Sequence, residues 1–233
     1  MKVRPEWSVL DMGCGGGTLC LPLAPMVRSI TAIDFSTSML EIVQRRCKEK
    51  GISNVKTVNC SWEDDWDKAG IEVHDIAIAS RSILGDDPRP FITKLSKAAR
   101  LAVYISAMVG NGPFDRPLFE STGRTFNMGK DYIHYYNILY EMGINANVGF
   151  CREDHGNVWA SHEEALEDQR WMFHGMTQED ENRVRDYLKE TLIETKEGRF
   201  ALPYERTCYW AVMWWNKDME GSSPNHEKIS AAT

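Results

Sequence analysis

The 233-residue chain lacks several features that would point to particular classes of protein. Its six cysteines include no Cys-x-x-Cys pair, no apolar run is long enough to span a bilayer, and no N-terminal stretch resembles a signal peptide. Positive charge is also scarce, because 27 Lys and Arg stand against 34 Asp and Glu, which gives a net charge of -7. Nucleic-acid binders usually need a clustered positive field. We therefore expect a cytoplasmic protein with reduced, buried thiols and no membrane or nucleic-acid partner.

Glycine, by contrast, is concentrated at one point near the start of the chain. An apolar stretch, Val9-Leu10, runs through Asp11 into a turn with four glycines in the five positions 13–17. Glycine loses the most backbone freedom on folding, so such a run would be costly inside a helix or strand. The segment must need positive φ angles or a very close backbone approach. A turn of this kind directly after a strand is typical of a loop that cradles a nucleotide.

The spacing of these glycines separates two interpretations of the loop. The dinucleotide fingerprint requires Gly-x-Gly-x-x-Gly, and counting from Gly13 places Thr18 where its third glycine should stand. The pattern actually present is Asp-x-Gly-x-Gly-x-Gly, beginning at Asp11. It resembles the first motif of class I S-adenosylmethionine-dependent methyltransferases. A nicotinamide-dependent oxidoreductase is the weaker alternative.

This resemblance implies a cofactor, S-adenosyl-L-methionine, with S-adenosyl-L-homocysteine as its product. In that family the acidic residue of the motif lies near the amino-acid end of the cofactor, and the glycine turn lets the backbone approach it closely. The cofactor contacts implied in this segment are Asp11, Gly13, Cys14, Gly15 and Gly17.

A second strand, residues 30–34, ends in the carboxylate of Asp34. An acidic side chain at this place can accept two hydrogen bonds from a ribose diol, a device that nicotinamide enzymes and methyltransferases share. The family resemblance further implies that Phe35 and Met39 lie by the adenine. Ser38 with Glu41 predicts a capping box that starts a helix, and Gly51 predicts its end.

The third and fourth strands, residues 55–58 and 75–79, lead to further expected contacts. In the family the turn after the third strand offers a polar and an apolar residue to the adenine, and the matching positions are Ser61 and Trp62, with the acid displaced to Glu63. Trp62 can equally be a packing aromatic, which is the commoner role. After the fourth strand, Ser80 should lie beside the methyl donor, since ligands of open α/β sheets sit at the carboxyl ends of the strands.

The order of elements predicts an α/β fold, with a doubly wound, mostly parallel sheet. A fifth strand at 102–106 follows a helix at 91–99, and residues 107–130 predict a long irregular loop. An aromatic helix at 131–140, a sixth strand at 146–151, helices at 162–174 and 178–194, and a bulky strand at 207–215 complete the series. The family resemblance implies seven strands in the order 3-2-1-4-5-7-6 with strand 7 antiparallel. We expect a single domain at 1–216, with a helical insert at about 155–200, and a polar, disordered tail at 217–233.

The acceptor is less well defined by the sequence. No Pro-Cys pair follows the fourth strand, as a cytosine-C5 enzyme would need, and no Asp/Asn-Pro-Pro-Tyr motif is present for an exocyclic amine. A small-molecule acceptor is therefore favoured. Arg81, Asp131, His134 and Tyr135 are candidates for acceptor contacts or proton transfer. The plainer alternatives are a solvated charge for Arg81 and helix packing for the aromatic residues, and we expect no metal site.

Two further expectations concern the whole molecule. Class I methyltransferases generally carry one or two helices before the first strand, whereas this strand begins about eight residues from Met1. Three interpretations stay open: the chain starts inside a longer gene product, the cofactor site is unusually open, or a second subunit of a homodimer partly closes it. Of these, we expect a cofactor site that is more exposed than usual. The main hypothesis is methyl transfer to a small molecule. The alternative is a cofactor-binding regulatory or partner subunit without transferase activity.

Overall fold

The computed structural model describes residues 1, 3–83, 85, 87–127, 129–154 and 157–219. The chain divides into two compact units. Unit 1 comprises residues 1–107, 132–149 and the segment from 211 onward, and unit 2 comprises residues 108–131 and 150–210. The predicted tail lies outside the described residues from 220 onward, and its first residues form a short 3-10 turn, Lys217–Met219.

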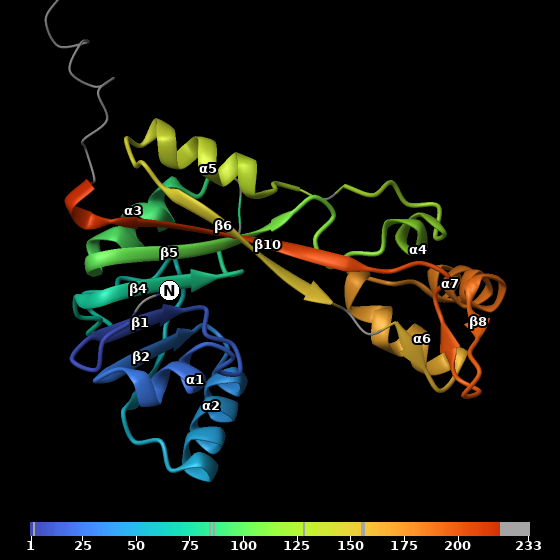
Figure 1. Ribbon diagram of the computed structural model, residues 1–233, viewed down its shortest axis with the longest axis horizontal. Helices are drawn as coiled ribbons and strands as arrows, with labels where there is room; N and C mark the ends of the chain where they lie inside the picture. Colours follow the sequence, from blue (N-terminus) through green and yellow to red (C-terminus); the bar gives the residue numbers. More distant parts are fainter. Residues whose placement is uncertain (2, 84, 86, 128, 155–156, 220–233) are drawn as a thin grey trace, which may run out of the picture. The chain divides into compact units, whose positions relative to one another are not determined.

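A seven-stranded sheet organises the chain (Figure 1). Its strands are β1 (Ser8–Met12), β2 (Ser29–Asp34), β3 (Val55–Asn59), β4 (His74–Ser80), β5 (Ala99–Val109), β6 (Asn147–Asp154) and β10 (Thr207–Asn216). They follow the order β3-β2-β1-β4-β5-β10-β6, with β10 antiparallel between β5 and β6. The predicted fold class, strand order and antiparallel last strand are confirmed.

The centre of the sheet is buried on both faces, as a doubly wound sheet requires. Every residue of β1 is buried, and its side chains alternate between two hydrophobic clusters, with Leu10 and Met12 in one and Val9 in the other. The helices of unit 1 are α1 (Cys20–Leu23), α2 (Thr37–Lys50), α3 (Arg89–Lys97) and α5 (Tyr132–Glu141), and a 3-10 turn spans Ala24–Met26. Because β1 pairs in parallel with both β2 and β4, the carboxyl ends of these three strands meet at one edge.

The start of α2 differs from the prediction by two residues. Its N-cap is Ser36, which has an extended backbone and whose hydroxyl accepts a hydrogen bond from the Met39 amide at 3.4 Å. Ser38, the predicted cap, lies inside the helix, where its hydroxyl hydrogen-bonds that of Ser36 at 2.9 Å. The predicted end of the helix is correct, because Gly51 adopts φ of 66° as a left-handed C-cap.

Unit 2 has its own hydrophobic core. Its helices are α4 (Arg116–Glu120), α6 (His162–Gln169) and α7 (Gln178–Thr191), with a 3-10 turn at Arg170–Met172, and a small sheet has the order β7-β9-β8 from Val158–Trp159, Phe200–Ala201 and Ile193–Glu194. The two helices expected at 162–174 and 178–194 begin as predicted, with Ser161 as the N-cap of α6 and Thr177 as that of α7. The stretch predicted as an irregular loop at 107–130 instead contains the end of β5 and helix α4. The prediction of a single domain remains a prediction.

Among the helices that the structure describes, none combines the length and the apolar character needed to cross a bilayer.

Candidate functional site

The glycine turn is fastened to the end of β2 by hydrogen bonds. The amides of Gly13 and Cys14 both donate to the Ile33 carbonyl, at 2.8 and 2.9 Å. The buried carboxylate of Asp34 accepts from the Gly15 amide at 2.8 Å through one oxygen and from the Ser36 amide at 2.9 Å through the other. A carboxylate oxygen has a second lone pair, so both can still accept a hydroxyl. Asp34 therefore shapes the turn and keeps acceptor capacity for a diol.

The three glycines at every second position of the motif have different structural roles. All have positive φ, which is 73° at Gly13, 51° at Gly15 and 90° at Gly17. A Cβ at Gly13 would lie 2.2 Å from the Cβ of Ser82, and one at Gly17 would lie 2.9 Å from the Leu21 side chain. A Cβ at Gly15 would meet no described atom within 4 Å. The outer glycines thus allow close packing inside the protein, whereas the middle one leaves space on the side where a ligand can approach.

A cavity of about 190 Å³ opens beside the turn. Its walls include Asp11, Gly13, Cys14, Gly15, Ser80 and Arg81. These are six of the residues predicted from the sequence, and they come from the ends of β1 and β4 and the turn between β1 and β2. The strand ends thus meet where the rule for open α/β sheets places a ligand.

Asp11 places a buried carboxyl group with a raised pKa on this cavity. It is 2% exposed, and its Oδ2 has no hydrogen-bond partner among the described residues. Burial raises the pKa of its carboxyl from 3.8 to about 7; the backbone N–H of Cys20 opposes this shift and the nearby charge of Asp34 adds to it. A cationic group entering the cavity would supply the missing partner for Asp11 and favour its ionised form.

Cys14 and Cys20, which flank the turn, are unsuited to act as nucleophiles. Burial raises the pKa of both thiols, to about 12 for Cys20, and the Asp11 charge adds to both shifts. The thiolate is the reactive form of cysteine, so these side chains are inert at neutral pH. Both side chains pack in the same hydrophobic cluster, as expected of buried cysteines.

The segment after β4 is held by hydrogen bonds on both sides of Arg81. The hydroxyl of Ser80 hydrogen-bonds that of Ser106 on β5 at 2.9 Å, and the Arg81 amide donates to the Ser106 carbonyl at 3.3 Å. The hydroxyl of Ser82 donates to the Met12 carbonyl at 2.7 Å. Arg81 itself has φ of 57°, which is uncommon for a residue other than glycine. Sequence reasoning missed the role of Ser82, because only the folded chain brings it against Gly13.

Trp62 packs against neighbouring aromatic rings. Its ring stacks on Trp66 with centroids 5.5 Å apart and contacts Phe91 at 5.2 Å. Its indole N–H donates to the Ser82 carbonyl at 2.8 Å, which ties the turn after β3 to the segment after β4. The amide of Ser61 is engaged locally by the Asp64 carboxylate at 2.7 Å. Contact of Ser61 and Trp62 with adenine stays a prediction.

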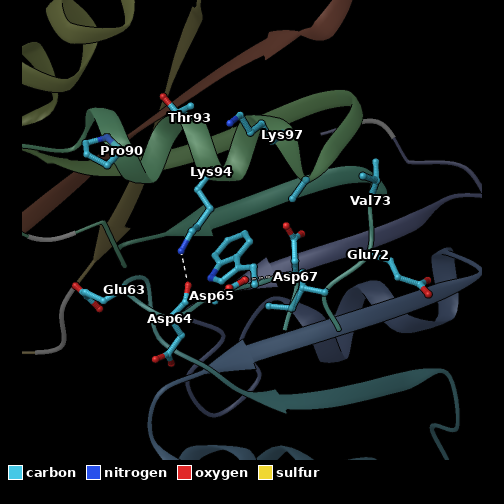
Figure 2. A pocket seen from close by; sticks show the side chains of 13 residues that line it. Glu63, Asp64, Asp65, Asp67, Glu72, Val73, Pro90, Thr93, Lys94 and Lys97 are labelled. Carbon is cyan, nitrogen blue, oxygen red and sulfur yellow. Dashed lines mark hydrogen bonds between the residues drawn. The ribbon is translucent and has the colours of Figure 1, made fainter. Parts of the chain in front are cut away.

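Glu63 lines a different cavity, of about 550 Å³, between the segment after β3 and helix α3 (Figure 2). Lys94 of α3 reaches into this region and donates to the carbonyls of Trp62 at 2.7 Å and Asp64 at 2.6 Å. The structure therefore does not place Glu63 on the wall of the glycine-turn cavity, because the chain turns away after Trp62. Phe35 and Met39, which follow Asp34, are 77% and 39% exposed and lie open to a ligand.

The acceptor candidates on and before α5 fall into different environments. Tyr135 is buried, its hydroxyl donates to the Ile83 carbonyl at 2.9 Å, and burial raises its pKa, so it supports the segment after β4 rather than exchanging protons. His134 has a buried Nε2 without a partner among the described residues, and Asp131 belongs to unit 2. No cluster of three or more potential metal ligands occurs in the described part of the chain.

Comparison with known proteins finds a family model that matches part of the chain and proteins that resemble it over most of its length. Residues 9–100 match the family model described as "Methyltransferase domain". An uncharacterized protein of Haemophilus influenzae is 29% identical over 219 residues, which cover 94% of this chain and 79% of that one. A presumed methyltransferase of Bacillus halodurans shares the fold with a TM-score of 0.62 at 15% identity, covering 92% and 94% of the two chains.

A second solved structure links the fold to a bound cofactor product. Coclaurine N-methyltransferase, crystallised with N-methylheliamine and SAH, superposes on this chain with a TM-score of 0.53 at 15% identity. The superposed region covers 92% of this chain and 68% of the coclaurine enzyme. At this identity the likeness concerns the fold alone. The match to the methyltransferase family model covers residues 9–100, and this solved structure adds a likeness of fold over most of the chain.

Proposed function

We propose that this protein transfers a methyl group from S-adenosyl-L-methionine to a small-molecule acceptor. The observation that carries the proposal is the cavity at the glycine turn. Its wall holds the buried carboxylate of Asp11, whose Oδ2 has no described partner, and the open face of Gly15, whose amide is bound by the carboxylate of Asp34 at the end of β2.

The residues present fit such a cofactor. Asp34 retains two acceptor positions suited to a ribose diol, and the open face of Gly15 admits a close backbone approach. Asp11 lacks a partner that an ammonium group would provide. Phe35 and Met39 offer exposed apolar surface next to Asp34, where a flat base can pack. This set favours a nucleoside that carries a cationic amino-acid end.

When bound, the cofactor supplies an already activated methyl group on a sulfonium. The chain's own residues then have to align an acceptor and exclude water, and alignment can contribute several kcal/mol to lowering a barrier. Ser80 and Arg81 stand on the cavity wall where an acceptor would approach, and the hydroxyl and amide contacts to Ser106 fix their backbone. The buried hydroxyl of Tyr135 is engaged by Ile83, so it is not offered as a base.

The net charge of the chain supports a small acceptor, and its free cysteines support a cytoplasmic location. A net charge of -7 and pI near 5.4 disfavour a polyanionic substrate, which supports a small molecule. All six cysteines are free, in keeping with a reducing, cytoplasmic setting. A homodimer that completes the acceptor side remains part of this proposal.

The test is transfer of label from S-adenosyl-L-methionine with a labelled methyl group into fractionated small-molecule pools. Label should appear in a small molecule, and the Asp34→Ala variant should lose the transfer. Tight cofactor binding with no transfer to any pool would favour the regulatory subunit instead. A comparison with Glu63→Gln, whose side chain lines the other cavity, controls for general loss of acidic charge.

A further inference from the structure

We propose that a second cavity, at the amino ends of β2, β3 and β4, binds a phosphate group, either free or carried by a phosphomonoester. The cavity has a volume of about 410 Å³, and its walls include Arg28, Ser29, Thr31, Ser53 and Lys56. This volume falls within the range of about 300–1,000 Å³ that is usual for small-molecule sites. The site is separate from the proposed methyl-donor site and does not depend on it.

The position of this cavity in the sheet separates it from the glycine turn. β2 pairs in parallel with β1 and β3, and β1 pairs in parallel with β4, so the starts of these strands share one edge of the sheet. The glycine turn follows the other end of β1. The six residues of β2, at about 3.3 Å per residue, place the two edges roughly 16 Å apart. A ligand in this cavity would therefore not overlap a cofactor at the glycine turn.

Two cationic side chains on the wall have no partner in the part of the chain that the structure describes. The guanidinium of Arg28 and the ammonium of Lys56 make neither ion pairs nor hydrogen bonds there. Partners are not scarce, since 34 acidic residues outnumber 27 basic ones. Glu72 is the acidic residue on the described wall, and no ion pair between described residues joins it to either cation. The wall thus carries two positive charges against one negative charge and attracts an anion.

The groups that would hold the anion lie on backbone that hydrogen bonds fix. The Arg28 amide donates to the Trp7 carbonyl at 2.8 Å. Lys56 lies opposite Thr31 in the pairing of β2 with β3, so the two side chains leave the same face of the sheet, and Ser29 shares that face. An arginine can donate two parallel hydrogen bonds, a lysine supplies a point charge and a hydroxyl donates one hydrogen bond. Donors on several strand ends suit the divergent oxygens of a phosphate better than a planar carboxylate.

His74, at the start of β4, places a buried imidazole on the same wall. It is 8% exposed, and its Nδ1 lies 2.7 Å from the Glu72 carbonyl and its Nε2 2.8 Å from the Thr31 hydroxyl. Because a carbonyl oxygen only accepts, the neutral ring carries its proton on Nδ1 and accepts from Thr31. Burial and the charge of Lys56 lower the pKa of His74, against the opposite effects of Glu72 and Asp75. A bound anion would favour the imidazolium and raise this pKa, so His74 reports whether the cavity is filled.

The experiment measures binding of inorganic phosphate, sulfate and glycerol 3-phosphate by calorimetry at constant ionic strength. We expect saturable binding that Arg28→Gln and Lys56→Gln each weaken about tenfold, because a charge-assisted hydrogen bond is lost. Arg45→Gln, on the exposed face of α2, removes the same charge outside the cavity and should leave the affinity unchanged. Tighter binding of the ester than of free phosphate would identify a phosphomonoester as the ligand, and the reverse would identify the free ion.

A second measurement follows the imidazole signals of His74 by NMR as pH is changed, with and without saturating sulfate, which keeps its charge across the titration range of histidine. The midpoint should rise by about 0.5 pH or more when sulfate is bound, because a nearby opposite charge favours the imidazolium. An unchanged midpoint under saturating sulfate would place the anion elsewhere and overturn the proposal. So would equal weakening by Arg45→Gln, which indicates a general charge effect, or a lack of saturable binding to the unchanged protein. None of these failures involves the methyl donor, so the proposed function would stand.

Discussion

Replacing Asp11 by Asn tests the electrostatics of the cavity most sharply. Burial and the charge of Asp34 raise the pKa of Asp11 from 3.8 to about 7 in the folded protein. The folded state then binds this proton more tightly than the unfolded state does. Between pH 4 and 7 the unfolded state is the less protonated one, so the free energy of unfolding falls as pH rises through this range.

The size of the effect follows from the shift. Three pKa units at 1.36 kcal/mol each amount to about 4 kcal/mol of stability lost above pH 7 compared with pH 4. Asp11→Asn keeps the shape of the side chain and removes the titration. The stability difference between the variant and the unchanged protein should therefore grow in favour of the variant by about 3 kcal/mol from pH 5 to pH 8.

The assay is denaturant unfolding of both proteins at pH 5, 6, 7 and 8 without ligand. Other titrating groups cancel in the difference between the two proteins, and a constant offset from the amide does not affect its slope. A difference that stays flat across this range would show that Asp11 titrates normally and would refute the account of a desolvated carboxylate.

Three further predictions address packing and exposure. Gly13→Ala should lower the free energy of unfolding by about 3 kcal/mol, because the new Cβ would overlap the side chain of Ser82. Gly15→Ala, whose Cβ would meet no described atom, should lower it by about 1 kcal/mol. Equal losses for the two variants in denaturant unfolding would contradict the geometry of the turn. Arg206→Met should destabilise unit 2 by about 3 kcal/mol, because it leaves the buried carboxylate of Asp115 without its ion pair. Unchanged hydrogen-exchange rates of the amides of unit 2 would contradict a stabilising role of this pair. A thiol reagent should label Cys151 rapidly and the five buried cysteines only on unfolding, so two or more fast thiols by mass spectrometry would contradict the burial pattern.

The parallel part of the fold could be predicted because its signals are local. The apolar strand before Asp11, the glycine spacing and the β-branched strand ending at Asp34 each identify an element from neighbouring residues. Unit 2 could be predicted only in part, through its helices α6 and α7. The three strands of its small sheet have two residues each, too short for a period to appear, and α4 lies among residues 107–130, where glycine and proline suggest only a loop.

The site was predictable where it depends on the backbone and not where it depends on tertiary packing. The glycine turn follows β1 and Asp34 ends β2, as the motif and the strand pattern predict, whereas the hydrogen bonds that join the two appear only in the folded chain. The placement of Glu63 in another cavity and the hydrogen bond from Trp62 to Ser82 depend on α3 and on the segment after β4. No spacing in the sequence reports such contacts, since the residues involved are 20 or more positions apart.

The central claim is that the glycine turn binds a methyl donor rather than a dinucleotide. Calorimetric titration of the unchanged protein with S-adenosyl-L-methionine and with NAD tests it most directly. The account predicts saturable binding of S-adenosyl-L-methionine that Asp34→Ala abolishes, and no binding of NAD. Binding of NAD with none of the sulfonium compound would contradict it.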